Sequence, residues 1–433
     1  MRCYFFFACF VCSFNGLKAQ TAASIAGELQ AINDSVSQLP FNGKSAAAIT
    51  HRGMNVFLAD KTGYLYGSND LSFFTNYITL STADGRFTVN HNFQPRHGKD
   101  DPIRSLFSVG FDLTVPGNYA NAFLDRRYES ELGLSLRYKW LGKVTTRFAE
   151  GPAGARQKEY MDAARTQLLA MLYQQLQEDA NNYAAASSTG SATVTTDSIR
   201  QLLRQQFYAE LGETYAGRFA EGQASLLTNA AAFRVLHTSW TAIAVYLPFY
   251  FPSYTVGQSF SNPLQRRRPF PVTITVTHTR FWEMSKAGRI FFVLEGGVLF
   301  NNSKLAQGLQ QYSYTEYKNS GGMDSLAIVN QPNDRLYIGQ YKTFVTPSLT
   351  ARFLYYPASS HVGISLLAQK NFLDFDPLNL RLGIPVVLIN SKKRPAVTLE
   401  CFVSFYDVTN RTQRGARNSA GLSLGIPFSR LMY

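Results

Sequence analysis

The sequence has few cysteines, few charged residues and no long apolar segment beyond its first twenty residues. Four of the 433 residues are Cys, and Cys3, Cys9 and Cys12 all lie at the N-terminal end. Cys401 is therefore the one thiol in the rest of the chain, which excludes an internal disulfide framework there. No later apolar run reaches the roughly 18 to 20 residues of a spanning helix. A chain of this kind can cross a membrane only by strands.

The sequence also lacks the usual marks of a catalytic or metal site. It has six histidines without metal-ligand spacing: His51, His91, His97, His237, His278 and His361. A phosphate-binding glycine loop and a Gly-x-Ser-x-Gly elbow are both absent. An outer-membrane hydrolase would need Ser and His on neighbouring lipid-facing strands; His278 has the required parity, but no partner for it can be identified. We predict no enzyme, no cofactor, no metal and no nucleic-acid partner.

The first nineteen residues predict a secretory signal peptide. Arg2 precedes an apolar core from Tyr4 to Phe14, and Ala19 stands before Gln20. This core is too short to span a bilayer, so we expect cleavage after Ala19. The lipoprotein alternative is disfavoured because the residues before Cys12 are neither small nor uniformly aliphatic.

The remaining chain is basic. Loss of Arg2 and Lys18 leaves 40 basic and 29 acidic residues, a net charge of +11. For an exported protein this charge favours an anionic surface such as lipopolysaccharide phosphate. Arg266, Arg267 and Arg268 lie in a predicted external loop and are our candidates for that contact. The alternative is that they are simply solvated.

Apolar residues alternate with polar or small ones along many segments of the chain. In Pro395 to Asp407 and in Asn418 to Phe428 one face is apolar and the other polar or small, as the period of a strand requires. About twelve segments show strand character: 72–80, 86–92, 105–115, 131–149, 233–251, 272–277, 290–300, 345–355, 362–369, 378–386, 395–407 and 418–428. Aromatic residues make up 14% of the chain and mean hydropathy is −0.14. The pattern predicts an all-β transmembrane fold, an antiparallel barrel of about 12 strands.

Two parts of the chain have a helical period instead. Residues Gln20 to Pro40 predict a short helix, and Gly151 to Asn229 predict a helical insertion between strands. Within the insertion, helical spacing covers 157–179 and 197–215, and 184–195 is a linker of small residues. The stretch Ser45 to Ser68 is irregular. Short strands at Asn55 to Leu58 and Gly63 to Tyr66 are an alternative there, and an extra hairpin before Leu71 would raise the count to fourteen.

The predicted organisation has five parts. They are the signal peptide 1–19, a periplasmic N-terminal segment 20–70, the first strands 71–149, the helical insertion 150–232, and the remaining strands 233–433. Short and long links alternate, as periplasmic turns and extracellular loops do, and counting back places the insertion in the periplasm. A miscount of one strand would move it to the cell surface. Pro347 and Pro385 lie inside strand patterns, where we expect ladder breaks or bulges.

Five charged residues have the parity of the barrel interior: Arg137, Glu295, Arg352, Arg381 and Glu400. Opposite charges there can form an ion-pair network that fills a narrow lumen, or line a path for charged solutes. We favour the filled lumen. Cys401 has the opposite parity and should face lipid.

The chain resembles bacterial outer-membrane β-barrel proteins. The features that carry the resemblance are the leader, the amphipathic strands and the terminal run Gly421-Leu422-Ser423-Leu424-Gly425-Ile426-Pro427-Phe428, which is similar to the C-terminal signal read by the barrel assembly machinery. Pro427 and the tail beyond Phe428 depart from that signal. The ending Leu17-Lys18-Ala19-Gln20 resembles the leaders of exported Bacteroidota proteins.

The resemblance implies a place in the outer membrane without fixing a role. Our first hypothesis is a non-enzymatic scaffold or accessory subunit of an envelope or secretion assembly, with a periplasmic partner on residues 151–229. A passive, porin-like solute channel is the alternative, and a hydrolase is a distant third. A soluble, secreted all-β protein is the main structural rival.

Overall fold

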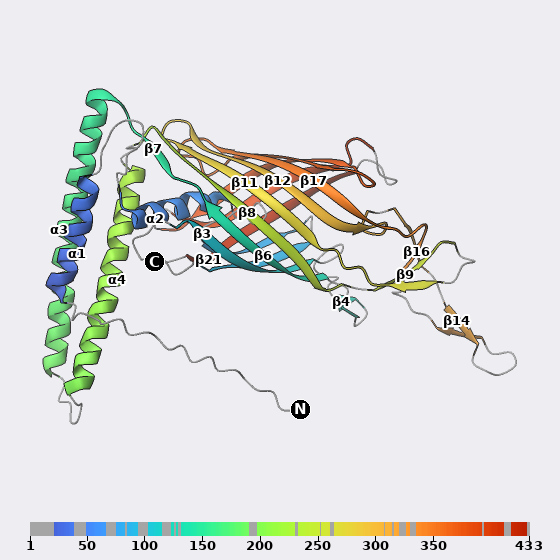
Figure 1. Ribbon diagram of the computed structural model, residues 1–433, viewed down its shortest axis with the longest axis horizontal. Coiled ribbons are helices and arrows are strands. Elements are labelled where there is room, and N and C mark those ends of the chain that lie inside the picture. Colours follow the sequence, from blue (N-terminus) through green and yellow to red (C-terminus); the bar gives the residue numbers. More distant parts are fainter. Residues whose placement is uncertain are drawn as a thin grey trace.

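The computed structural model describes residues 21–38, 49–65, 75–82, 85–93, 103–114, 123–124, 127–128, 131–189, 197–229, 233–251, 253–259, 264–306, 308–313, 316–319, 326–329, 335–391, 394–410 and 417–430. The predicted signal peptide lies outside these residues. Twelve antiparallel strands form a closed barrel (Figure 1). In order around the barrel they are β1 (Thr75–Ser81), β2 (Arg86–Phe93), β3 (Ser105–Thr114), β6 (Glu131–Leu141), β8 (Val235–Tyr250), β11 (Thr273–Met284), β12 (Gly288–Asn302), β17 (Thr343–Tyr356), β18 (Ile364–Asn371), β19 (Leu378–Ile389), β20 (Pro395–Tyr406) and β21 (Arg417–Arg430).

The barrel closes where its first strand pairs with its last. Thr75 of β1 lies opposite Arg430 of β21, and one register shift occurs between Asn76 and Tyr77, beside Pro427. Strands β1 and β2 form a hairpin, with Ser81 opposite Arg86 and Gly85 at φ 59°. A closed cylinder leaves no sheet edge, which is the condition for strands to cross a bilayer.

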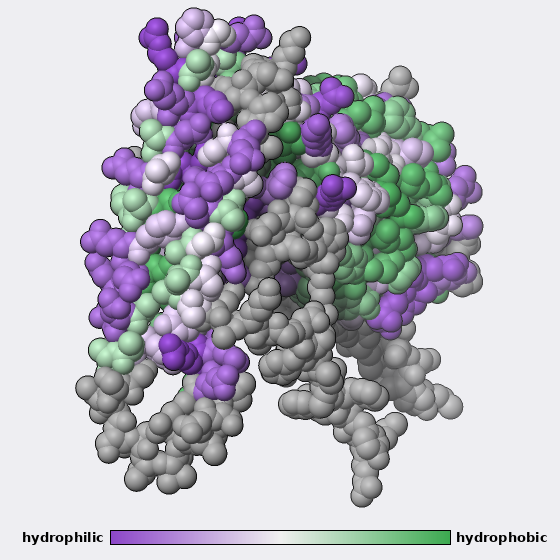
Figure 2. Space-filling view, turned by 60° about the vertical axis from the view of Figure 1, so that its left-hand side comes forward, coloured by the Kyte–Doolittle hydropathy of each residue, from purple (hydrophilic) through white to green (hydrophobic). Residues whose placement is uncertain are grey.

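The outer face of the barrel is apolar. Along β12, Phe292, Leu294, Val298 and Phe300 are exposed, whereas Phe291 is buried. The same parity recurs around the wall, and Figure 2 shows the resulting band of hydrophobic surface beside the helices. Cys401 is exposed on this face, as predicted. The rival prediction of a soluble, secreted all-β protein is wrong, because these apolar side chains point outward from one closed sheet and are not buried inside it.

The two strand prolines cause no bulge, but one ladder ends beside each of them: β17–β18 at Ser348 and β18–β19 at Gly383. The register runs through Pro347 opposite Val298 and through Pro385 opposite Glu400. Each proline lies just beyond one end of the eight-residue strand β18, and its carbonyl accepts from Phe372 or Gly363 in the adjoining link. The missing N–H of each proline therefore faces the side on which the ladder has ended, while pairing with the strand on the other side continues.

The helices gather at one end of the barrel (Figure 1). They are α1 (Ala22–Ser37), α2 (His51–Thr62) with the 3₁₀ turn η1 (Gly63–Leu65), α3 (Gly151–Thr189) and α4 (Asp197–Asn229). Helices α1, α3 and α4 pack into one unit, which we call the helical unit, around apolar residues such as Leu29, Leu172 and Phe219. Arg165 of α3 is buried in it and donates to Asn33 and Ser37 of α1, each at 2.8 Å. None of the described helices is long and apolar enough to cross a membrane.

The opposite end carries short strands. They are β4 (Phe123–Leu124), β5 (Arg127–Tyr128), β9 (Tyr254–Gly257), β10 (Gln265–Arg267), β13 (Gln310–Ser313), β14 (Glu316–Asn319), β15 (Leu326–Val329) and β16 (Arg335–Ile338). Four of them, β10, β9, β16 and β13, form a small sheet beyond the barrel rim.

Three further expectations need correction. Residues 55–58 and 63–66 do not form strands, because α2 and η1 occupy the described part of this stretch. The barrel therefore has twelve strands and not fourteen. The long strand predicted over 131–149 is divided into β6 and β7 (Thr145–Arg147), with a break at 142–144, although both parts pair with β8.

Candidate functional site

Helix α2 and η1 lie in the mouth of the barrel at the helix end, and we call residues His51–Leu65 the stopper. Thr50 caps the N-terminus of α2, and its side chain accepts a hydrogen bond from the Gly53 amide at 3.0 Å. Gln223 of α4 accepts from the Thr50 hydroxyl at 2.6 Å and from its amide at 3.0 Å. The cap is therefore held by the helical unit, and a capping hydroxyl contributes about 1 kcal/mol to a helix.

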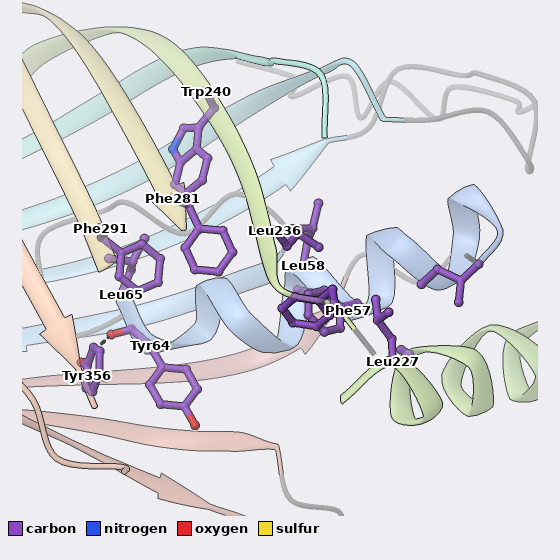
Figure 3. Packing of buried hydrophobic residues seen from close by; sticks show 14 of the residues in the cluster. Phe57, Leu58, Tyr64, Leu65, Leu227, Leu236, Trp240, Phe281, Phe291 and Tyr356 are labelled. Carbon is purple, nitrogen blue, oxygen red and sulfur yellow. Dashed lines mark hydrogen bonds between the residues drawn. The ribbon is translucent and has the colours of Figure 1, made fainter. Parts of the chain in front are cut away.

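The stopper packs against the inner wall through apolar side chains. Figure 3 shows Phe57, Leu58 and Leu65 amid side chains from α4 and from barrel strands. The surrounding residues include Leu227, Leu236, Trp240, Phe281 and Phe291. All three stopper residues are 1% exposed or less. Full burial of each such side chain is worth about 1.5 to 3 kcal/mol, so this cluster fixes the stopper in the mouth.

A buried set of charges joins the stopper to β11 and β12. Glu283 accepts from Arg289 at 2.6 Å and forms an ion pair with Lys61 of α2 at 3.5 Å. The Arg289 guanidinium also lies 3.8 Å from the centre of the Tyr64 ring. Burial lowers the pKa of Lys61, although Glu283 opposes that effect. One carboxylate thus serves two buried cations, and removal of such a central partner is costly.

Tyr64 connects the stopper to β17 and to the turn that follows it. Its carbonyl accepts from the Tyr356 hydroxyl at 2.9 Å (Figure 3), and its own hydroxyl is 3.1 Å from Nδ1 of His361. Thr398 of β20 donates to the neighbouring Gly63 carbonyl at 3.2 Å. Burial and the charges of Arg289 and Lys61 lower the pKa of His361, so the neutral ring faces Tyr64. The Gly63 and Tyr64 carbonyls at the end of the stopper thus accept hydrogen bonds from Thr398 and Tyr356 inside the barrel.

Ion pairs tie the stopper and a barrel turn to α4. Arg394, in the link between β19 and β20, is 3.8 Å from Asp60 and 3.1 Å from Glu221. Arg52 is 3.4 Å from Glu213. The stopper, the wall and the helical unit therefore form one connected body at this end.

The five predicted interior residues all lie on the inward side of the wall. Arg352 and Glu400 are buried, at 5% and 1% exposure. Glu295 accepts from Thr277 at 2.9 Å, and its charge acts on Arg137. Arg381 is placed differently: it donates to Ser404 at 3.0 Å and lies 4.0 Å from the centre of the Phe402 ring. The structure thus places all five residues on the inward side of the barrel wall.

A second interior network was not identified from the sequence. Asp112 of β3 accepts from Arg86 at 2.7 Å, from Thr88 at 2.6 Å and from Ser135. Asn92 accepts from Ser108 at 2.5 Å and from Lys139 at 3.3 Å. The inward parity of these residues was visible in the sequence, but their partners depend on the register of three strands, β2, β3 and β6. The network covers one side of the lumen with bonded polar groups.

The three predicted lipopolysaccharide-contact arginines lie at the far rim. Arg266 donates to Ser253 at 2.8 Å, and Arg267 lies over the Tyr341 ring at 5.7 Å. Arg268 lies over Tyr250 at 5.7 Å and donates to the Phe251 carbonyl at 3.2 Å. All three remain exposed. All of these contacts are to other residues of the rim, so each arginine packs against the rim. Its exposed part adds positive charge to the surface there.

Among the described residues no group of His, Cys, Asp or Glu could hold a metal ion. His278 lies on the outer face, with Nδ1 2.9 Å from the Thr241 hydroxyl of β8. Thus a threonine, and not the serine that a hydrolase would need, is its hydrogen-bond partner.

No family model and no curated protein matches the sequence. Solved structures that resemble the chain include the NanC porin, at 6% identity and a TM-score of 0.30, covering 82% of this chain and 100% of that one. The beta domain of the Bordetella autotransporter Brka is 8% identical with a TM-score of 0.29, covering 82% and 98%. OmpT, an outer membrane protein of Vibrio cholerae, is 7% identical with a TM-score of 0.22, covering 82% and 94%.

The class of the protein rests on its own geometry. A closed barrel of twelve antiparallel strands with an apolar outer face is the structure that spans outer membranes. The protein is an outer-membrane β-barrel. The signal peptide and the Bacteroidota resemblance stay predictions.

Proposed function

We propose that this protein is a non-enzymatic scaffold or accessory subunit of an envelope or secretion assembly. The observation that supports this role is the stopper, which is bonded to the barrel wall through Glu283 and Tyr356 and to the helical unit through Gln223. A body connected in this way holds the helical unit at a fixed place beneath the membrane. It also obstructs the mouth that a solute would use.

We propose that the helical unit lies in the periplasm. At its end of the barrel the links 285–287, 357–363 and 390–394 are short. At the other end the links 115–130, 251–272, 303–342 and 407–416 are longer, and 82–85 and 372–377 are the short ones there. Outer-membrane barrels have short periplasmic turns and longer extracellular loops.

We propose that a periplasmic protein partner binds one face of α3. From Tyr160 to Gln177, every exposed residue of this helix is uncharged, and exposed Glu159 and Glu178 stand at the two ends of this stretch. Tyr160 and Met171 are 58% and 54% exposed on it. Protein interfaces are depleted in charged residues and enriched in Tyr and Met, whereas a solvated helix face is normally charged. The exposed face of α4 provides the contrast, because it includes Arg204, Glu210 and Arg218.

In-cell photocrosslinking tests this proposal. A photoreactive residue is placed at Met171 of α3 and, as the control, at exposed Thr214 of α4. We expect a discrete protein adduct from position 171 only, and expect Ala170→Glu to abolish it while the barrel still shifts in gel mobility on heating. Equal adducts at both positions, or none at 171, would contradict a partner site on α3.

The second candidate is a passive solute channel, which the buried interior charges favour. If it is correct, the purified protein should give reproducible single-channel steps in planar bilayers, lost on Arg352→Gln and Arg381→Gln together. A silent bilayer supports the scaffold. A hydrolase would require turnover of lipid or peptide substrate by the purified protein.

Two further partners belong to the proposal. Arg266, Arg267 and Arg268 would contact lipopolysaccharide phosphate at the outer rim, beside exposed Phe249 and Phe270. The barrel assembly machinery would read the segment that forms β21 during insertion.

A further inference from the structure

Three basic side chains meet on the outer face of the barrel at its helix end. Arg147 of β7 and Arg280 of β11 are exposed, while their neighbours Thr146 and Thr279 are buried on the inward side. His237 of β8 has the outward parity as well. Charged residues on the lipid side of a barrel wall are costly at the membrane centre and tolerated near the headgroups.

The strand register brings the three together. His237 lies opposite Trp282 of β11 and Thr145 of β7, whereas Arg280 lies opposite Ser239 and Arg147 opposite Val235. Both arginines are thus diagonal neighbours of His237, one on each side. Diagonal pairs lie about 7 to 8 Å apart, within reach of long side chains. The charges of Arg280 and Arg147 both act on the His237 ring.

No acidic residue neutralises this group among the residues that the structure describes. Glu283 is close along β11, but it points inward and binds Lys61 and Arg289. Neither Arg147 nor Arg280 forms an ion pair with a described residue, and Glu150, exposed in the link to α3, is bonded to neither. Two more cations flank the group, because Lys143 and Lys286 are exposed in the adjoining links.

The group lies at the level where headgroups meet hydrocarbon. His237 is two residues from the end of β8, and Trp282 packs on it at 5.3 Å between ring centres. Trp residues mark membrane interfaces. Further along the same two strands, Ile243 and Val276 are 40% and 47% exposed and begin the apolar band.

We propose that Arg147, His237 and Arg280 bind the phosphate of an anionic phospholipid, with its acyl chains against Ile243 and Val276. Guanidinium groups form paired, charge-assisted hydrogen bonds to phosphate, and the imidazole supplies a further donor. The lipid would stand in the leaflet next to the helical unit. Only this choice of leaflet rests on the proposed orientation; binding itself does not.

Native mass spectrometry of the full-length protein in detergent tests the site. The probes are phosphatidylglycerol, phosphatidylcholine and lipid A, and the variants are the pair Arg147→Gln/Arg280→Gln and the control Arg204→Gln, an exposed arginine of α4. We expect the wild type and the control to retain phosphatidylglycerol over phosphatidylcholine. The double variant should bind phosphatidylglycerol about a hundredfold more weakly, because it loses two charge-assisted bonds and each is worth about tenfold or more.

The outcomes separate cleanly. Unchanged phosphatidylglycerol binding in the double variant, with folding verified by gel mobility, overturns the site. A preference for lipid A over phosphatidylglycerol overturns the assignment to phospholipid. Failure of the α3 crosslinking experiment with the lipid result intact removes the partner proposal and leaves this one standing.

Discussion

The hydroxyl of Tyr356 donates a 2.9 Å hydrogen bond to the backbone carbonyl of Tyr64, and so joins the wall strand β17 to the stopper inside the barrel. The preceding residue shows the opposite arrangement. Tyr355 points outward and donates to the carbonyl of Ala287 in an exposed turn, also at 2.9 Å. Two adjacent tyrosines thus make the same bond, one inside and one outside.

Tyr356→Phe should loosen the stopper. It leaves the Tyr64 carbonyl buried without this donor, a loss worth about 1 to 3 kcal/mol. Hydrogen exchange should show faster exchange of the amides of residues 57–65. Tyr355→Phe is the matched control and should leave them unchanged, because water can replace the bond in the exposed turn. If both substitutions changed the exchange rates equally, the internal bond of Tyr356 would stabilise the stopper no more than the external bond of Tyr355 does.

The stability of the helical unit should depend on pH above 10. Burial, together with the 2.8 Å hydrogen bond to Asp179, raises the pKa of Tyr215 from 10.0 to about 12. The folded state then holds a proton that the unfolded state releases, so the stabilisation is complete below pH 10 and is lost as pH rises toward 12. Urea unfolding followed by the helical circular dichroism signal should show this decline. Tyr215→Phe should flatten it, and an unchanged slope would assign the effect to another group.

Proline should be tolerated in β17 only where the neighbouring strand has ended. Pro347→Ala should change the unfolding free energy by less than about 0.5 kcal/mol, because no ladder bond is restored. Ala351→Pro should cost about 3 kcal/mol or more, because Ala351 is paired on both sides, with Leu294 and Ala368. The temperature of the gel-mobility shift measures both. A large effect of Pro347→Ala would show that the ring itself stabilises the strand.

Cys401 should react according to the solubility of the reagent. It lies on the outer face between Ile384 and Leu422, within the apolar band. A lipid-soluble maleimide should label it in membranes, and a charged maleimide should not. Unfolding in urea should make both reagents effective. Labelling of the membrane-inserted protein by the charged reagent would place this face in water.

The strands were predictable because their burial has a local signature. Phe291, Phe292 and Val293 alternate between lumen and lipid, and a period of two is visible without knowledge of any partner. The stopper had no such signature. Phe57 and Leu58 are buried side by side, and Lys61 is buried through partners far along the chain, so the helix shows no apolar stripe.

The interior site was predictable in position but not in pairing. Parity placed Arg352 and Glu400 inside the barrel, and both lie there. The bonds of Glu283 and Tyr356 to the stopper were not predictable, because the sequence did not indicate the stopper as helical. The grouping of Arg147 with His237 and Arg280 depends on how β7 pairs with β8 after the break at 142–144. The sequence predicted one continuous strand over 131–149, so this grouping was not predictable from it.

The bonds to Gly63 and Tyr64 have a consequence for biogenesis. Their partners, Thr398 and Tyr356, are 335 and 292 residues later in the chain. During export the carbonyls of this early segment must remain hydrated until the late strands arrive. The stopper can therefore take its final position only after the last strands have inserted. In a molecule halted before that point, the stopper would be accessible to periplasmic proteases.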